Sequence, residues 1–91
     1  MTDKIFVGRR KNAVARVYLR NGSGKITVND KEFEKFFSRK DHSDNLMLPF
    51  VATETLGKYD VFANVNGGGI SGQSDAIRLG ISRALEEING D

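Results

Sequence analysis

The sequence lacks cysteine and tryptophan, and it has a single proline and a single histidine among 91 residues. Without cysteine, a disulfide framework and a zinc site built on thiolates are excluded. No apolar stretch approaches the ~20 residues that a membrane-spanning helix needs. No apolar or arginine-rich leader precedes the strand-like run that begins at Ile5. We therefore expect a cytoplasmic protein without a membrane partner.

Net charge is also small, but the charged residues are unevenly placed. The net charge is +2, yet residues 1–40 carry 11 Lys and Arg against 4 Asp and Glu, whereas residues 41–91 carry 3 against 8. A cationic half that faces a polyanion would produce this asymmetry, and so would unevenly scattered surface charge. With 38% hydrophobic residues the chain can form one modest core, and we expect residues 1–91 to be a single domain.

Alternation of apolar and polar residues predicts several short strands. Residues 13–20 alternate most clearly, with a basic and aromatic open face, and a turn at 21–24 then predicts a hairpin. Residues 8–12 are expected to be a basic connector. The strands are expected at residues 5–7, 13–20, 25–28 and 59–65.

Three helices are expected between and after these strands. Asn29 and Glu32 have the spacing of a capping box before a short helix, and residues 38–45 are expected to be a polar loop. A second helix is predicted from about 46 to 56, and a third from a Ser71 cap to about Ile88. The order predicts an α+β fold, in which helices pack on one face of a mixed, mostly antiparallel sheet.

A basic run is the first candidate for a binding site. Arg and Lys side chains bind phosphate as a planar fork and as a mobile point charge, and a tyrosine between arginines can stack on a base or ribose. The alternative is a solvated strand face with a tyrosine at the edge of the core. The residues concerned are Arg9, Arg10, Lys11, Arg16, Tyr18, Arg20 and Lys25.

A glycine-rich loop before the last helix is the second candidate. Amides at a helix start present unpaired donors and a positive dipole end to an anion such as phosphate. The alternative is a tight turn that needs only positive φ. A dinucleotide-binding unit is excluded because no strand follows the last helix, and the lysine of a Walker loop is missing. The residues concerned are Gly67, Gly68, Gly69, Ser71, Gly72 and Gln73.

No catalytic group, metal ligand or cofactor site is predicted. His42 is expected to be a surface residue in the polar loop. The loop after residue 66 leaves open a phosphate-binding enzyme such as a small-molecule kinase, for which nucleotide would raise the melting temperature. A protein-interaction module is a third hypothesis, with Asp41, Asp44, Glu54 and Asp60 facing a basic neighbour.

Two long motifs resemble a known family. GRRKNAVARV at 8–17 and YDVFANVNGGGISGQ at 59–73, followed by AIR and ISRAL, are similar to small-subunit ribosomal protein nine in its bacterial form. The resemblance covers essentially the whole chain. It implies an α+β domain like the second domain of ribosomal protein five. It also implies a structural, non-enzymatic role in translation.

The resemblance further implies ribosomal RNA of the 3′ major domain and neighbouring proteins of the subunit head as partners. Members of this family continue into a basic tail that touches transfer RNA, and this sequence shows no such tail up to Asp91. We therefore expect contact with transfer RNA only through a tail of that kind. The RNA contacts implied are Gly8, Arg9, Arg10, Lys11, Arg16, Gly67, Gly68, Gly69, Ser71, Gly72, Gln73, Arg78 and Arg83.

Overall fold

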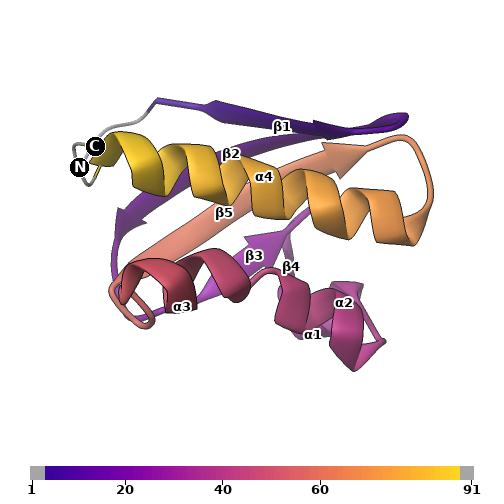
Figure 1. The fold of residues 1–91 in the computed structure, drawn as a ribbon. Coiled ribbons are helices and arrows are strands. Elements are labelled where there is room, and N and C mark those ends of the chain that lie inside the picture. The colour runs from indigo at the N-terminus through magenta and orange to yellow at the C-terminus, as the bar shows by residue number, and fades with distance from the viewer. Residues whose placement is uncertain (1–3, 89–91) are drawn as a thin grey trace.

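The computed structural model describes residues 4–88 and has a five-stranded sheet in the order β1-β2-β5-β3-β4 (Figure 1). β3 pairs with β5 in parallel, and the other neighbouring strands are antiparallel. The sheet is therefore mixed and mostly antiparallel, as predicted. The predicted hairpin of strands 13–20 and 25–28 is wrong, because β5 lies between β2 and β3 and pairs with both. The strands are β1 (Phe6–Arg10), β2 (Ala13–Asn21), β3 (Ile26–Val28), β4 (Lys31–Glu32) and β5 (Tyr59–Asn66).

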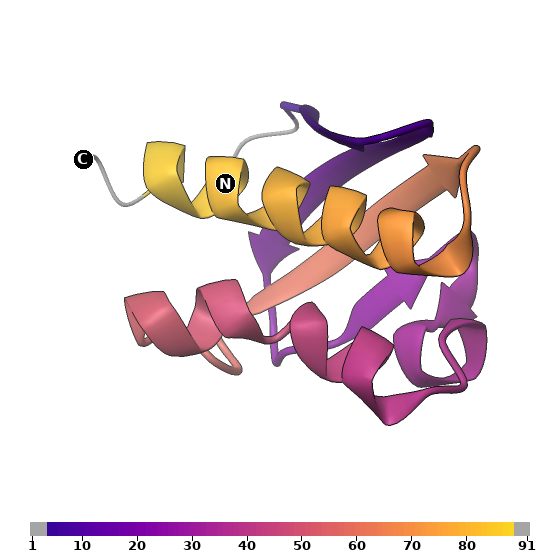
Figure 2. The same cartoon turned by 45° about the vertical axis from the view of Figure 1, so that its right-hand side comes forward.

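The helices lie on one face of this sheet (Figures 1 and 2), which confirms the predicted α+β architecture. The long last helix packs on β1, β2 and β5 and also contacts the two helices before it. The helices are α1 (Phe33–Phe36), α2 (Lys40–Asn45), α3 (Leu48–Thr53) and α4 (Ile70–Ile88). None of the helices in this part of the chain is long and apolar enough to cross a membrane.

The core lies between the sheet and α4. In β2 the side chains of Ala15, Val17 and Leu19 are buried, while Arg16 is exposed on the other face. This alternation confirms the half-buried strand predicted at 13–20. α4 contributes the buried Ile77, Ile81, Ala84 and Leu85, and the segment from α1 to α3 adds Phe37, Leu46 and Phe50.

Glycines let α4 approach the sheet closely. A Cβ at Gly8 would lie 2.6 Å from the backbone nitrogen of Gly80 and closer still to the carbonyl oxygen of Ala76. A Cβ at Gly80 would lie 2.7 Å from Cγ2 of Val17. The absence of side chains at Gly8 and Gly80 therefore allows the short distance between β1 and α4.

Several predicted boundaries were wrong. The basic connector continues β1 as far as Arg10, because the turn needs only residues 11 and 12. Asn29 does not cap a helix. Its side chain accepts a hydrogen bond from the backbone N–H of Val65 at 2.8 Å and donates to the Val65 carbonyl at 3.1 Å. The chain turns at Asn29 and Asp30, which both have positive φ, and enters β4, a strand that was not predicted, before α1 begins at Phe33.

The remaining helices also differ from the prediction. Residues 40–45, predicted as a loop, form α2, because packing against α4 stabilises a helix whose own sequence is polar. α3 is shorter than predicted and ends at Thr53, and the next residue, Glu54, takes the left-handed conformation in place of a glycine. α4 begins at Ile70, so Ser71 lies inside its first turn and is not its cap.

A candidate nucleic-acid interface

The two candidate motifs meet at one end of the sheet. The turn between β1 and β2 and the loop between β5 and α4 lie side by side (Figure 1). A Cβ at Gly72 would be 3.5 Å from the carbonyl oxygen of Arg10, and one at Gly67 would overlap the carbonyl oxygen of Asn12. Gly67 also has a φ of 79°, which favours glycine. The loop is thus fitted against the basic hairpin.

Alternation along β1 sends the basic side chains to different sides. Arg9 pairs with Val14 in register and shares the open face of the sheet with Arg16. Arg10 lies on the helix side, where its Nε is 3.6 Å from a carboxylate oxygen of Asp75. Lys11 occupies the hairpin turn with a φ of 54°. All four cations are exposed, but they surround the end of the sheet and do not form one flat patch.

The start of α4 supplies backbone donors next to these cations. Its first amides have no intrahelical carbonyl to bond, and they sit at the positive end of the helix dipole. The glycine loop that leads to them is exposed at Gly67, Gly68 and Gly69. Gln73 joins this loop to the helix through two hydrogen bonds. Its side-chain amide donates to the Gly67 carbonyl at 3.2 Å, and its backbone N–H donates to the Gly69 carbonyl at 2.9 Å.

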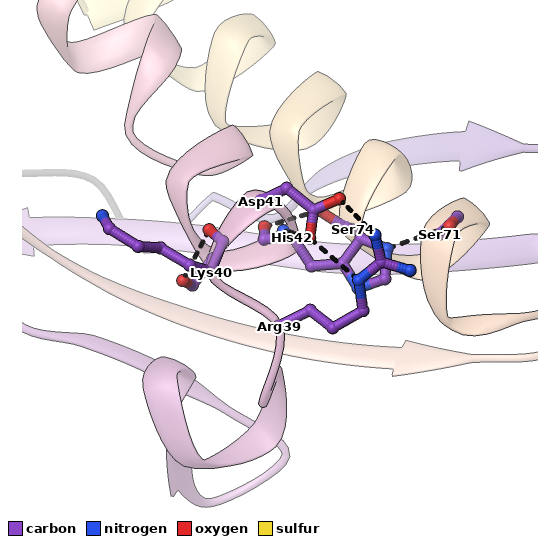
Figure 3. Close-up of polar contacts among 7 residues, drawn as sticks. Arg39, Lys40, Asp41, His42, Ser71 and Ser74 are labelled. Atoms are coloured by element: carbon purple, nitrogen blue, oxygen red, sulfur yellow. Dashed lines mark hydrogen bonds and ion pairs between the residues drawn. The ribbon is translucent and has the colours of Figure 1, made fainter.

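A polar cluster under the start of α4 was missed by the sequence analysis (Figure 3). His42, expected on the surface, is 9% exposed, and its Nε2 is 3.0 Å from Oγ of Ser71. The hydroxyl of Ser74 donates to the carbonyl of His42 at 2.8 Å. Asn45 donates to Ser74 at 3.1 Å and to Asp75 at 2.8 Å. The only sequence signal for this burial was the spacing of four residues between His42 and the buried Leu46.

The open face of the sheet carries an aromatic pair. The rings of Tyr18 and Phe62, which face each other across β2 and β5, stack with centroids 5.2 Å apart. The guanidinium of Arg20 lies 5.7 Å from the centroid of Tyr18. Arg20 and Lys25 are at the end of the sheet away from the glycine loop, about 20 Å along β5. These two residues therefore belong to a separate surface.

Asp60 has a structural role at that far end. Its Oδ1 accepts hydrogen bonds from the backbone amides of Lys25, Ser23 and Gly24 at 3.0, 3.1 and 3.2 Å. The Lys25 amide, then the Ser23 and Gly24 amides and the Lys25 charge, lower the pKa of the Asp60 carboxyl, and burial opposes them. Two more carboxylates of the supposed acidic interaction surface, Asp41 and Asp44, bond Arg39 and Lys40 within the same segment of chain. The charges of Asp41 and Asp44 are therefore paired with neighbouring cations of the same chain.

Three expected contacts lie away from the hairpin tip. Gly8 is buried against α4, so its position is explained by helix packing. The Nη2 of Arg78 is 3.9 Å from Asp75, and its Nε is buried with no hydrogen-bond partner among residues 4–88. Arg83 is exposed near the end of the described helix, about 18 Å from Ser71. Within residues 4–88, no three His, Asp or Glu side chains gather as ligands for a metal ion.

Comparison with known proteins matches residues 8–91 to the family described as ribosomal protein S9/S16. The small ribosomal subunit protein uS9 of Borreliella afzelii (strain PKo) is 56% identical over 82 residues. The protein of the same description from Borreliella burgdorferi (strain ZS7) is 55% identical over 82 residues. Each match covers 90% of this chain but 60% of the relative, so the chain spans 60% of the length of these relatives.

Proposed function

Because the chain belongs to the ribosomal protein S9/S16 family, we propose that it is a structural constituent of the small ribosomal subunit. It binds ribosomal RNA, supports translation on the cytoplasmic ribosome and is not an enzyme. The observation that carries this proposal is the meeting of the basic β1–β2 hairpin with the glycine loop at the start of α4. Two motifs that are distant in sequence thus place cations and backbone donors around one end of the sheet.

The physical basis of binding is phosphate recognition. Lysine and arginine side chains release counterions from RNA when they contact phosphates, and this sequence-independent term supplies much of the affinity. The unpaired amides at the start of α4 add directional donors, which fix the orientation of the backbone that they contact. Arg9 and Lys11 have no acidic partner among the ion pairs of the described residues, whereas Arg10 shares its charge with Asp75. Arg9 and Lys11 therefore contribute most of the electrostatic term at this end.

The resemblance to the family supports a finer placement. The RNA partner is the 3′ major domain in the subunit head, and neighbouring head proteins are the protein partners. A contact with transfer RNA is expected only through a basic tail of the kind that the resemblance implies. Tyr18, Arg20 and Lys25 on the far half of the sheet, together with Arg78 and Arg83 on α4, remain predicted RNA contacts.

The test is the salt dependence of binding to a fragment of the 3′ major domain. R9A/K11A is expected to weaken binding and to lower the slope of log K against log salt by about 0.7–0.9 for each phosphate that the variant leaves unneutralised. The matched control is K31A/K35A, which removes the same charge from exposed positions on β4 and α1, beyond the opposite edge of the sheet. The control variant is expected to keep the wild-type slope.

An unrelated RNA of the same length separates specific from generic binding. Tighter binding to the 3′ fragment that persists at high salt supports a specific site on this chain. An unchanged slope for R9A/K11A, or an equal fall for the control variant, would contradict the role of the hairpin tip. Equal affinity for both RNAs would contradict the placement in the head.

A further inference from the structure

His42 connects α2 to the start of α4. Its side chain meets the hydroxyl of Ser71 at 3.0 Å, and its carbonyl accepts a hydrogen bond from Ser74 about one turn further along α4 (Figure 3). The ring also packs edge-on against Phe37, with centroids 6.2 Å apart. With only 9% of its surface exposed, His42 is held in place before any ligand arrives.

The start of α2 is itself fixed by local bonds. Oδ1 of Asp41 accepts the backbone N–H of His42 at 3.0 Å and the Nε of Arg39 at 3.2 Å. Lys40 bonds the carboxylate of Asp44 at 3.0 Å. The bonds that Asn45 and the His42 carbonyl make with Ser74 hold this helix against α4, so His42 has a defined position relative to Ser71.

A serine hydroxyl has one proton to donate and two lone pairs to accept with. If Nε2 of His42 is unprotonated, Ser71 must donate its proton to the ring and offers only lone pairs to an incoming anion. If Nε2 carries a proton, the ring donates to Ser71, and the hydroxyl proton remains for a phosphate oxygen. Ser71 is exposed in the first turn of α4, so a phosphate at that helix end can reach it.

We propose that His42 is a positioning residue of the RNA site: its Nε2–H donates to Ser71 and turns the Ser71 hydroxyl proton toward an RNA phosphate. This inference rests on the proposed function, because it requires RNA phosphate at the start of α4. It adds α2, a helix remote in sequence from both basic and glycine motifs, to the parts of the chain that determine binding.

The direct test is ¹⁵N NMR of the His42 imidazole, which is the only imidazole in the chain. Spectra of the wild-type protein, free and bound to the 3′-domain RNA fragment at one fixed pH, report which ring nitrogens carry a proton. A proton on Nε2 in the complex, with Nδ1 either bare or protonated, is expected. An unprotonated Nε2 in the complex would overturn the proposal, and this measurement needs no variant.

A double-mutant cycle tests the route through Ser71. H42F keeps an aromatic ring beside Phe37 but removes Nε2, and S71A removes the hydroxyl. S71A is expected to weaken RNA binding about fivefold, which is typical for one hydrogen bond. H42F is expected to weaken it about two- to fivefold in the wild-type background but not in S71A. H42Q, whose side-chain amide can donate to Ser71, is expected to restore most of the affinity.

The salt slope distinguishes this role from the cationic one. Neither H42F nor S71A removes a lysine or arginine, so both should keep the wild-type slope, whereas R9A/K11A lowers it. Additive effects of H42F and S71A on affinity, or an H42Q variant as weak as H42F, would overturn the route through Ser71.

If R9A/K11A weakens binding and H42F does not, only this inference fails. If the wild-type chain does not bind the RNA fragment, the proposed function fails as well. Thermal melts of each variant confirm that it is folded at the temperature used.

Discussion

Replacing Gly8 with alanine is expected to destabilise the protein strongly, although the change adds a single methyl group. The new Cβ would lie 2.6 Å from the backbone nitrogen of Gly80 and closer to the carbonyl oxygen of Ala76, where real Cβ atoms stay beyond 3.0 Å. Both neighbours are backbone atoms of α4, so no side-chain rotation can relieve the overlap. The helix must move away from β1 instead.

The cost can be estimated from that movement. A gap of about 1 Å forfeits up to half of the dispersion energy of the contacts that it separates. Overpacking of this kind costs about 1–3 kcal/mol and sometimes more, and the rigid partners place G8A at the upper end, about 3 kcal/mol. For a chain of 91 residues the total stability is of order 5–14 kcal/mol. The melting temperature should fall by roughly 12–24 °C.

Urea unfolding followed by circular dichroism measures this destabilisation, and Gly69 offers the matched control. A Cβ at Gly69 has no atom within 4 Å, so G69A is expected to change the free energy of unfolding by less than about 0.5 kcal/mol. A G8A variant within about 1 kcal/mol of wild type would refute the close approach of α4 to β1. Below its melting temperature, folded G8A should bind RNA with a wild-type salt slope, since no charge is removed.

Two further predictions concern stability. The pKa of Asp60 is lowered in the folded state, so its contribution is present above the unfolded value near 3.8 and is lost as pH falls through the folded value. D60N should therefore be less stable than wild type at pH 7, and it should lose less stability than wild type on acidification below pH 3.8. Urea titrations at several pH values measure this difference. Equal losses of stability in the two proteins would contradict this reasoning. Glu54 ends α3 with a φ of 57°, so E54G should raise the free energy of unfolding by about 0.5–1 kcal/mol. A lower melting temperature for E54G would indicate that the side chain contributes more than the strained backbone costs.

Local patterns in the sequence were enough to predict much of the framework. The alternation at 13–20 predicted which side chains β2 buries, because the period of a strand is fixed by its own geometry. The spacing of Ile77, Ile81 and Leu85 likewise predicted the buried face of α4. The two long motifs were enough to indicate the family, because their residues and order are specific.

Contacts between distant segments were beyond such patterns. Residues 40–45 have a polar sequence, and they form a helix because α4, about 30 residues further on, packs against them. The same packing buries His42 and brings it to Ser71. Asn29 has the residue type and spacing of a helix cap, but its side chain bonds Val65, a partner 36 residues away.

The sequence by itself thus determined the α+β class, the buried faces of β2 and α4, the family and the two motifs that we propose bind RNA, because each follows from residue types and spacing along the chain. Tertiary structure alone decided that the motifs meet, that β5 lies between β2 and β3, and that Gly8 serves helix packing. The physical reason is that these outcomes depend on how β5 pairs with β2 and on how closely α4 packs on the sheet. Such long-range contacts are set by the packing of the whole core and leave no local period in the sequence.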